Sequence, residues 1–150
     1  MITKITNQKY DEMVKFHTPT SKTSLNIVKA FVCGGIICMI GQMIKDLLGI
    51  ASLSKDEIDN FTTIIMIGLG AALTALNVYQ KIGKFAGAGS IVPITGFANS
   101  VVSPAMEFKS EGLVTGTGSK MFIIAGPVLV YGISAAIIVG VIKLLIMSAI

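Results

Sequence analysis

Two glutamates near the middle of the chain have a spacing that could support chemistry. Glu107 and Glu111 lie four positions apart, so a helix would carry both on one face. Paired carboxylates can act as general acid and general base in an enzyme. Glu107 is the better candidate for such a catalytic group. The same spacing also suits the solvated end of a helix, and that simpler interpretation is favoured.

A second set of candidates is polar but uncharged, and it follows Lys84 in the stretch KIGKFAGAGSIVPITGFANS, residues 81–100. Hydroxyl and amide side chains can form the polar wall of a solute path without the strong binding that several buried charges would cause. These side chains are Ser90, Thr95, Asn99 and Ser100. Lys84 itself either attracts an anion or extends its charged end to the membrane surface.

Other signatures of chemistry are absent from the sequence. It contains no phosphate-binding loop, no complete dinucleotide-binding motif, no serine-hydrolase elbow and no zinc-protease motif. Cys33 and Cys38 are five positions apart and do not share a helix face. Every basic residue is lysine, whereas nucleic-acid recognition relies on arginine. We therefore predict no enzyme activity, no nucleic-acid binding, no metal site and no cofactor.

The composition predicts the kind of scaffold that must position these residues. Of 150 residues, 53% are hydrophobic and 13% are charged, against about a quarter charged in a soluble domain. We expect an all-α membrane helix bundle with a polar N-terminal segment, residues 1–24, and a membrane domain, residues 25–150. The N-terminal segment is either a helix at the membrane surface or an unstructured tail.

Three apolar runs are long enough to cross a bilayer, which takes about 20 helical residues. They cover residues 27–48, 61–79 and 121–147. Gln42 is the one strongly polar side chain well inside the first run, and it either bonds to a neighbouring helix or lines a path. Ser54 and Glu57 have the spacing of a capping box, which predicts a helix start there.

A fourth apolar segment, residues 85–106, contains poor helix formers at Gly87, Gly89, Pro93 and Gly96. Broken backbone at membrane depth is tolerated where protein buries it or where it lines a water-filled cavity, and transporters place solute sites at such breaks. The residues leave two interpretations open. The segment is either a broken or re-entrant helix pair along a solute path, or a small-residue helix kinked at Pro93 and packed in a bundle.

Small residues at helical spacing indicate close helix packing. The candidates are Gly68, Gly70, Ala75, Gly83, Gly112, Gly116, Gly132 and Ala136. The lysines suggest the orientation, because five precede or open the first run and one lies in the next loop. The positive-inside rule then places the N-terminus in the cytoplasm. Three or four crossings remain possible, depending on residues 85–106.

Three blocks of sequence carry a resemblance to a known family. AFVCGGIICMIGQ, KIGKFAGAGSIVPITGFANS and AMEFKSEGLV closely resemble the stage V sporulation protein A (SpoVA) membrane protein family, and the layout over residues 9–145 is most similar to its AC branch. One departure is Gln80, which stands where the family often has an acidic residue. A role that depends on that acid is therefore in doubt here.

The resemblance implies a channel subunit, with tension-sensitive gating, that moves dipicolinic acid as its calcium chelate across the inner spore membrane in sporulation and germination. It implies two kinds of partner, AE-type membrane subunits and a soluble dipicolinate-binding subunit. The residues expected along the path are Lys84, Gly87, Gly89, Ser90, Pro93, Thr95, Asn99 and Ser100. The alternative is a structural subunit of the same complex that conducts nothing.

Overall fold

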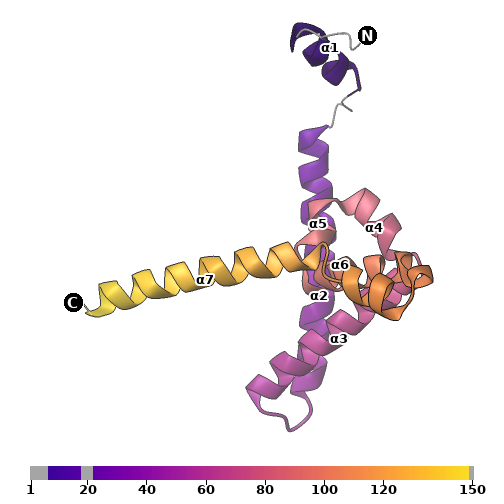
Figure 1. Cartoon of the computed structure of the whole chain (residues 1–150). Coiled ribbons are helices and arrows are strands. Elements are labelled where there is room, and N and C mark those ends of the chain that lie inside the picture. The colour runs from indigo at the N-terminus through magenta and orange to yellow at the C-terminus, as the bar shows by residue number, and fades with distance from the viewer. Residues whose placement is uncertain (1–6, 18–21, 149–150) are drawn as a thin grey trace.

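The structure, a computed structural model, describes residues 7–17 and 22–148. In that part of the chain every regular element is a helix (Figure 1), which confirms the predicted all-α class. The elements in order are α1 (Asn7–His17), α2 (Thr23–Gly49), α3 (Lys55–Ala75), α4 (Tyr79–Ala86), α5 (Ala88–Ile91), α6 (Ile94–Glu107), the 3-10 turn η1 (Lys109–Glu111), the π-helical turn η2 (Leu113–Gly118) and α7 (Ala125–Ser148). Helix α1 supports the helical alternative for part of the N-terminal segment.

Helices α2, α3 and α7 are each long and apolar enough to cross a membrane. They coincide with the three predicted apolar runs, with shifts at their ends. The break in the fourth segment is also present, because α4, α5 and α6 replace a continuous helix and Pro93 stands between the last two.

Helix α3 ends at Ala75, earlier than the predicted residue 79, because the chain turns into the left-handed region at Asn77 (φ 57°). The backbone N–H of Asn77 donates to the Thr74 carbonyl, and the backbone N–H of Val78 donates to the Leu73 carbonyl. This is the Schellman pattern that terminates helices. Asparagine is one of the few residues other than glycine that tolerates such a φ.

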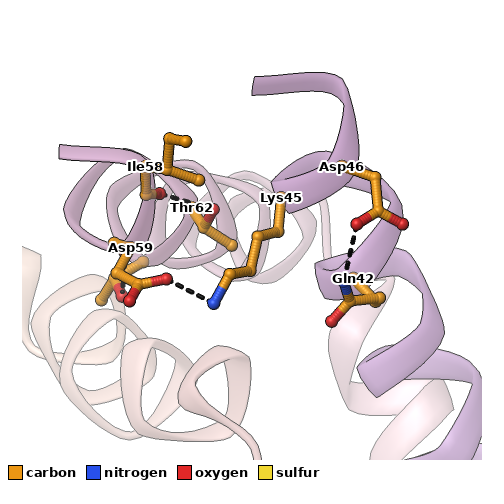
Figure 2. Close-up of polar contacts among 7 residues, drawn as sticks. Gln42, Lys45, Asp46, Ile58, Asp59 and Thr62 are labelled. Carbon is orange, nitrogen blue, oxygen red and sulfur yellow. Dashed lines mark hydrogen bonds and ion pairs between the residues drawn. The ribbon is translucent and has the colours of Figure 1, made fainter. Parts of the chain in front are cut away.

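Helices α2 and α3 form an antiparallel hairpin whose loop end, residues 42–62, is held by local polar contacts (Figure 2). Lys45 Nζ lies 2.5 Å from Asp59 Oδ1 across the two helices. Gln42 Nε2 donates to Asp46 Oδ1 over 2.7 Å within α2. The expected capping box is confirmed, since Ser54 and Glu57 bond reciprocally at the start of α3.

At the other end of the hairpin the chain doubles back. Helix α4 leads from α3 toward the first half of α2, and α5 lies against α2 with Gly89 beside Ala30. The chain then turns at Pro93, and α6 packs along α3 (Figure 1).

The pairing of residues gives the direction of α6. Thr95 contacts Gly70, and Asn99 contacts Thr74 further along, so α6 runs parallel to α3. Both helices therefore finish at the same end of the bundle. Residues 79–107 therefore begin and finish at the same end of the bundle, which favours the re-entrant interpretation over a fourth crossing. We call this the re-entrant end of the hairpin.

Helix α7 projects away from the other helices (Figure 1), and its contacts are chiefly with α6. Ala125 is buried, whereas the side chains from Leu129 to Ser148 are exposed. Pro127 lies in the first turn of α7, where its missing N–H removes no helical hydrogen bond. The apolar surface of α7 is thus left free for lipid or for another protein.

Candidate functional site

A tyrosine joins the three short helices of the re-entrant segment. Tyr79 is 3% exposed, and its hydroxyl donates to the Ser90 carbonyl over 2.7 Å and lies 2.9 Å from Thr95 Oγ1. Ser90 and Thr95, both expected along a solute path, are 1% and 5% exposed. The structure places them inside this junction, where their polar groups are bonded.

The predicted glycines in this region allow close backbone contact. A Cβ added to Gly89 would lie 2.1 Å from the Ala30 carbonyl oxygen, and one added to Gly96 would lie 2.3 Å from that of Ser90. A Cβ on Gly70 would lie 2.8 Å from the Thr95 carbonyl oxygen. Only glycine permits these approaches, so α5 and α6 are held directly against α2 and α3.

A polar hollow opens where α3 and α6 finish. Its volume is about 340 Å³, and seven residues line it: Thr74, Asn77, Gln80, Asn99, Ser103, Met106 and Glu107. Asn99 and Glu107 were candidates from the sequence. Thr74, Asn77 and Ser103 were not, and Gln80 was noted only as a departure from the family pattern.

The fold uses some polar groups of this hollow and leaves others without a side-chain bond among the described residues. Thr74 Oγ1 lies 2.7 Å from the Gly70 carbonyl and 3.0 Å from Asn99 Oδ1, and its single proton can serve only one acceptor at a time. Glu107 is exposed and, among the described residues, forms no ion pair. The hollow thus offers amides, hydroxyls and one carboxylate to a solute.

A second hollow, of about 380 Å³, lies between α4 and the first turns of α2. It contains the predicted Lys84 and Gly87 together with Thr23 and Asn26, which the sequence did not single out. Gly87 has φ 53°, so it makes the turn between α4 and α5. The two hollows share no lining residue, and the structure does not bring Lys84 and Asn99 into one site.

The predicted pairing of Glu107 and Glu111 on one helix face is wrong. Helix α6 ends at Glu107, and Lys109–Glu111 forms a separate 3-10 turn. The chain leaves α-helical geometry at Phe108 (φ −94°, ψ 13°), so four-residue spacing no longer gives a shared face. Glu107 lines the polar hollow and Glu111 does not.

The remaining candidates lie elsewhere. Ser100 Oγ donates to the Phe97 carbonyl over 2.7 Å, and Gln42 is exposed at the loop end. Among the small residues proposed for packing, Gly116 lies against Phe108, and Gly83 lies near Ser90. Gly112 adopts φ 97° in a turn. Four have open or exposed surroundings: Gly68, Ala75, Gly132 and Ala136.

Comparison with known proteins gives a consistent match along most of the chain. The model of the SpoVAC/SpoVAEB sporulation membrane protein family matches residues 26–142. The chain is 45% identical over 137 residues to stage V sporulation protein AC of Bacillus subtilis (strain 168), and the match covers 91% of each of the two chains. No solved structure matches the chain.

Proposed function

The chain belongs to the SpoVAC/SpoVAEB sporulation membrane protein family, and we propose that it is a channel subunit for dipicolinic acid, carried as its calcium chelate across the inner spore membrane. The observation that carries this proposal is the re-entrant segment. Residues 79–107 enter and leave at one end of the bundle and expose a polar hollow there. Re-entrant backbone beside a polar cavity is an arrangement that membrane proteins use to pass solutes.

The distribution of lysines supports an orientation for this channel. Six lysines lie at the re-entrant end: Lys22, Lys29, Lys81, Lys84, Lys109 and Lys120. The loop end has Lys45 and Lys55, together with four acidic residues. The positive-inside rule then favours a cytoplasmic re-entrant end and N-terminus. Three crossings would place the C-terminus on the opposite side.

The packing of the re-entrant segment suggests how membrane tension could act. Helix α5 rests on α2 through Gly89, and α6 rests on α3 through Gly70. Tyr79 ties α5 and α6 together by its hydroxyl group. Lateral expansion of the bilayer would separate α2 from α3 and so pull α5 away from α6. We propose that this separation widens the path.

A structural role is the second candidate, and α7 is the observation that favours it. Gly132 and Gly140 have no atom within 4 Å of an added Cβ, which leaves a face for close contact with another membrane helix. In this alternative, AE-type subunits pack on α7 and the chain itself does not conduct. The soluble dipicolinate-binding subunit would be a further partner in either case.

Dipicolinate efflux from liposomes that contain the purified full chain tests the proposal, with and without osmotic down-shock. We expect efflux that rises with down-shock and falls roughly tenfold in Asn99→Leu, the factor that corresponds to about 1.4 kcal/mol of lost hydrogen bonding. The matched control is Asn60→Leu, at the exposed start of α3 near the loop end, which should conduct normally.

The structural alternative predicts a different outcome. Wild-type protein that is inserted in the liposomes would show no efflux under either condition. AE-type subunits would co-purify with the wild type but not with Ala136→Leu. Efflux that survives in Asn99→Leu would contradict the assignment of the polar hollow to the path.

A further inference from the structure

We propose that the chain binds one anionic phospholipid between α2 and the α4–α5 turn, with the headgroup in the hollow that contains Lys84 and one acyl chain in an adjoining apolar groove. This inference goes beyond the proposed conduction of dipicolinate. It concerns residues that line no part of the polar hollow at the ends of α3 and α6, and it does not depend on whether the chain conducts.

The first argument is the chemistry of the hollow between α4 and the first turns of α2. Lys84 brings a positive charge to its lining, and Thr23 and Asn26 add a hydroxyl and an amide group. None of the described residues that line it is acidic. Within the described chain, the side chains of these three residues form no hydrogen bond or ion pair. They are therefore free to bind the phosphate group of a lipid, with the lysine as a charged donor.

Further positive charge lies around this hollow. Lys29 Nζ is 4.8 Å from the centroid of the Phe85 ring, and Phe85 lines the hollow. This cation–π contact holds a second ammonium group beside the hollow. Lys22 directly precedes α2, and Lys81 lies about one turn before Lys84 in α4. Basic pockets between membrane helices bind the headgroups of anionic lipids, so this charge should select a lipid with a net negative headgroup.

The second argument is an apolar groove that continues from the hollow. The groove has a volume of about 360 Å³ and shares Ala30 and Ala88 with the hollow. It runs on past Gly34 and Cys38 of α2, with Val92 on the opposite wall, and none of its described lining residues is charged. A ligand that fills both the hollow and the groove must have an anionic head and an apolar tail.

The fold explains why this part of α2 is left open. Helix α5 lies against α2 at Ala30 but ends at Ile91, and the chain then turns at Pro93 so that α6 packs on α3. Cys38, farther along α2, is therefore exposed, and so is Val92. The groove is the space that the short helix α5 leaves uncovered.

The length of the groove fits one acyl chain. Ala30, Gly34 and Cys38 follow one another at four-residue intervals on α2, so they share a face and span about 12 Å of helix. The hydrocarbon of one leaflet is about 15 Å thick. Thr23 and Asn26 come just before the apolar run that begins at residue 27, which places the hollow at the membrane surface. The hollow and the groove thus occur in the order of a phospholipid's head and tail.

The test is titration of the purified full chain in a neutral detergent with phosphatidylglycerol, with native mass spectrometry to count the bound lipids. Phosphatidylcholine with the same acyl chains is the comparison lipid, and inorganic phosphate is added as a competitor. We expect one phosphatidylglycerol per chain, bound at least roughly tenfold more tightly than phosphatidylcholine because two lysines meet its net charge. Inorganic phosphate should not displace it, since phosphate has no apolar tail.

Lys84→Gln tests the headgroup site. It should weaken the binding of phosphatidylglycerol about fivefold, the factor expected when one lysine near an anionic headgroup is lost. The matched control is Lys109→Gln, which removes the same charge from an exposed position outside the hollow. If the two variants weaken binding equally, the lysines act only as a diffuse surface charge, and the assigned site is wrong.

Cys38→Phe tests the acyl groove, because it places a ring in the groove from an exposed position. It should weaken the binding of phosphatidylglycerol at least roughly tenfold, since each methylene group excluded from apolar surface costs about fourfold in affinity. Thermal unfolding measured without lipid should not change. Val32→Phe, also exposed on α2 but outside the groove, is the control and should bind as the wild type does.

Three results would overturn the inference. Equal binding of the two lipids would remove the charge selection, and equal effects of Cys38→Phe and Val32→Phe would remove the groove. Displacement of phosphatidylglycerol by inorganic phosphate would indicate a site for free phosphate instead of a lipid. These measurements contain no dipicolinate, so their failure and a failure of conduction are distinguishable.

Discussion

The two ends of the α2–α3 hairpin differ in how far their polar side chains are bonded within the fold. At the loop end, Lys45 pairs with Asp59 and Gln42 bonds to Asp46, so these polar groups satisfy one another (Figure 2). At the re-entrant end, Glu107 and Asn77 line a hollow and find no ion pair or side-chain bond among the described residues. The first pattern stabilises a fold, whereas the second leaves groups available to a solute.

The surroundings of the glycines also differ between the two ends. Gly89, in α5, meets the backbone of Ala30, whereas Gly49, beside the loop, has no atom within 4 Å of an added Cβ. The loop end is closed by five residues between α2 and α3, Ile50 to Ser54. The re-entrant end needs close contacts between segments far apart in sequence. It is therefore the end where single substitutions should matter most.

The largest effect is expected for Gly89→Ala. The new methyl group would lie 2.1 Å from the Ala30 carbonyl oxygen, so α5 must move away from α2. Overpacking of this kind costs about 1–3 kcal/mol and sometimes more. We expect a lower unfolding temperature in nanodiscs and loss of dipicolinate efflux. Gly35→Ala, which meets nothing within 4 Å, should behave as the wild type, and equal effects of the two changes would contradict the assigned contact.

An intermediate effect is expected for Tyr79→Phe. Loss of the hydroxyl leaves the buried Ser90 carbonyl and Thr95 hydroxyl without this partner, which costs about 1–3 kcal/mol. We expect lower thermal stability and efflux at a smaller osmotic down-shock, because α5 and α6 separate more easily. Tyr131→Phe, on exposed α7, is the control. If Tyr79→Phe lowers thermal stability but leaves the down-shock threshold unchanged, the hydroxyl of Tyr79 stabilises the fold and does not control gating.

The smallest effect is expected at the loop end. The Lys45 and Asp59 side chains are 40% and 46% exposed, and exposed ion pairs contribute about 0–1 kcal/mol. In a double-mutant cycle of Lys45→Ala and Asp59→Ala, we expect a coupling energy within that range and normal efflux. Strong loss of efflux would show that the loop end also takes part in conduction, and the comparison of the two ends would no longer hold.

Local features of this fold could be predicted from the sequence, because their causes lie within a few residues. The three apolar runs, the capping box at Ser54 and the break at Pro93 are all present. The early end of α3 was missed, although an asparagine shortly after a run of small residues is a recognisable termination signal. The pairing of Glu107 with Glu111 failed because a helix end between them changes the geometry.

The candidate site could be predicted only in part, because it depends on contacts between distant segments. The direction of α6 is fixed by Thr95 meeting Gly70 and by the bonds of Tyr79. No local pattern contains that information. Thr74 and Ser103 belong to the hollow only because α3 and α6 run parallel. Conversely, Ser90 matched the pattern of a path residue but is bonded inside the junction.

The central claim is that residues 79–107 leave the membrane on the side where they entered it. The direct test is labelling of single cysteines by an impermeant maleimide in oriented membrane vesicles, with Cys33 and Cys38 replaced by alanine. Gln80→Cys and Ser110→Cys flank the segment and are both exposed. We predict that the two are labelled from the same side and that Ser52→Cys, in the α2–α3 loop, is labelled from the other. Labelling of Gln80→Cys and Ser110→Cys from opposite sides would establish a fourth crossing and contradict the re-entrant path.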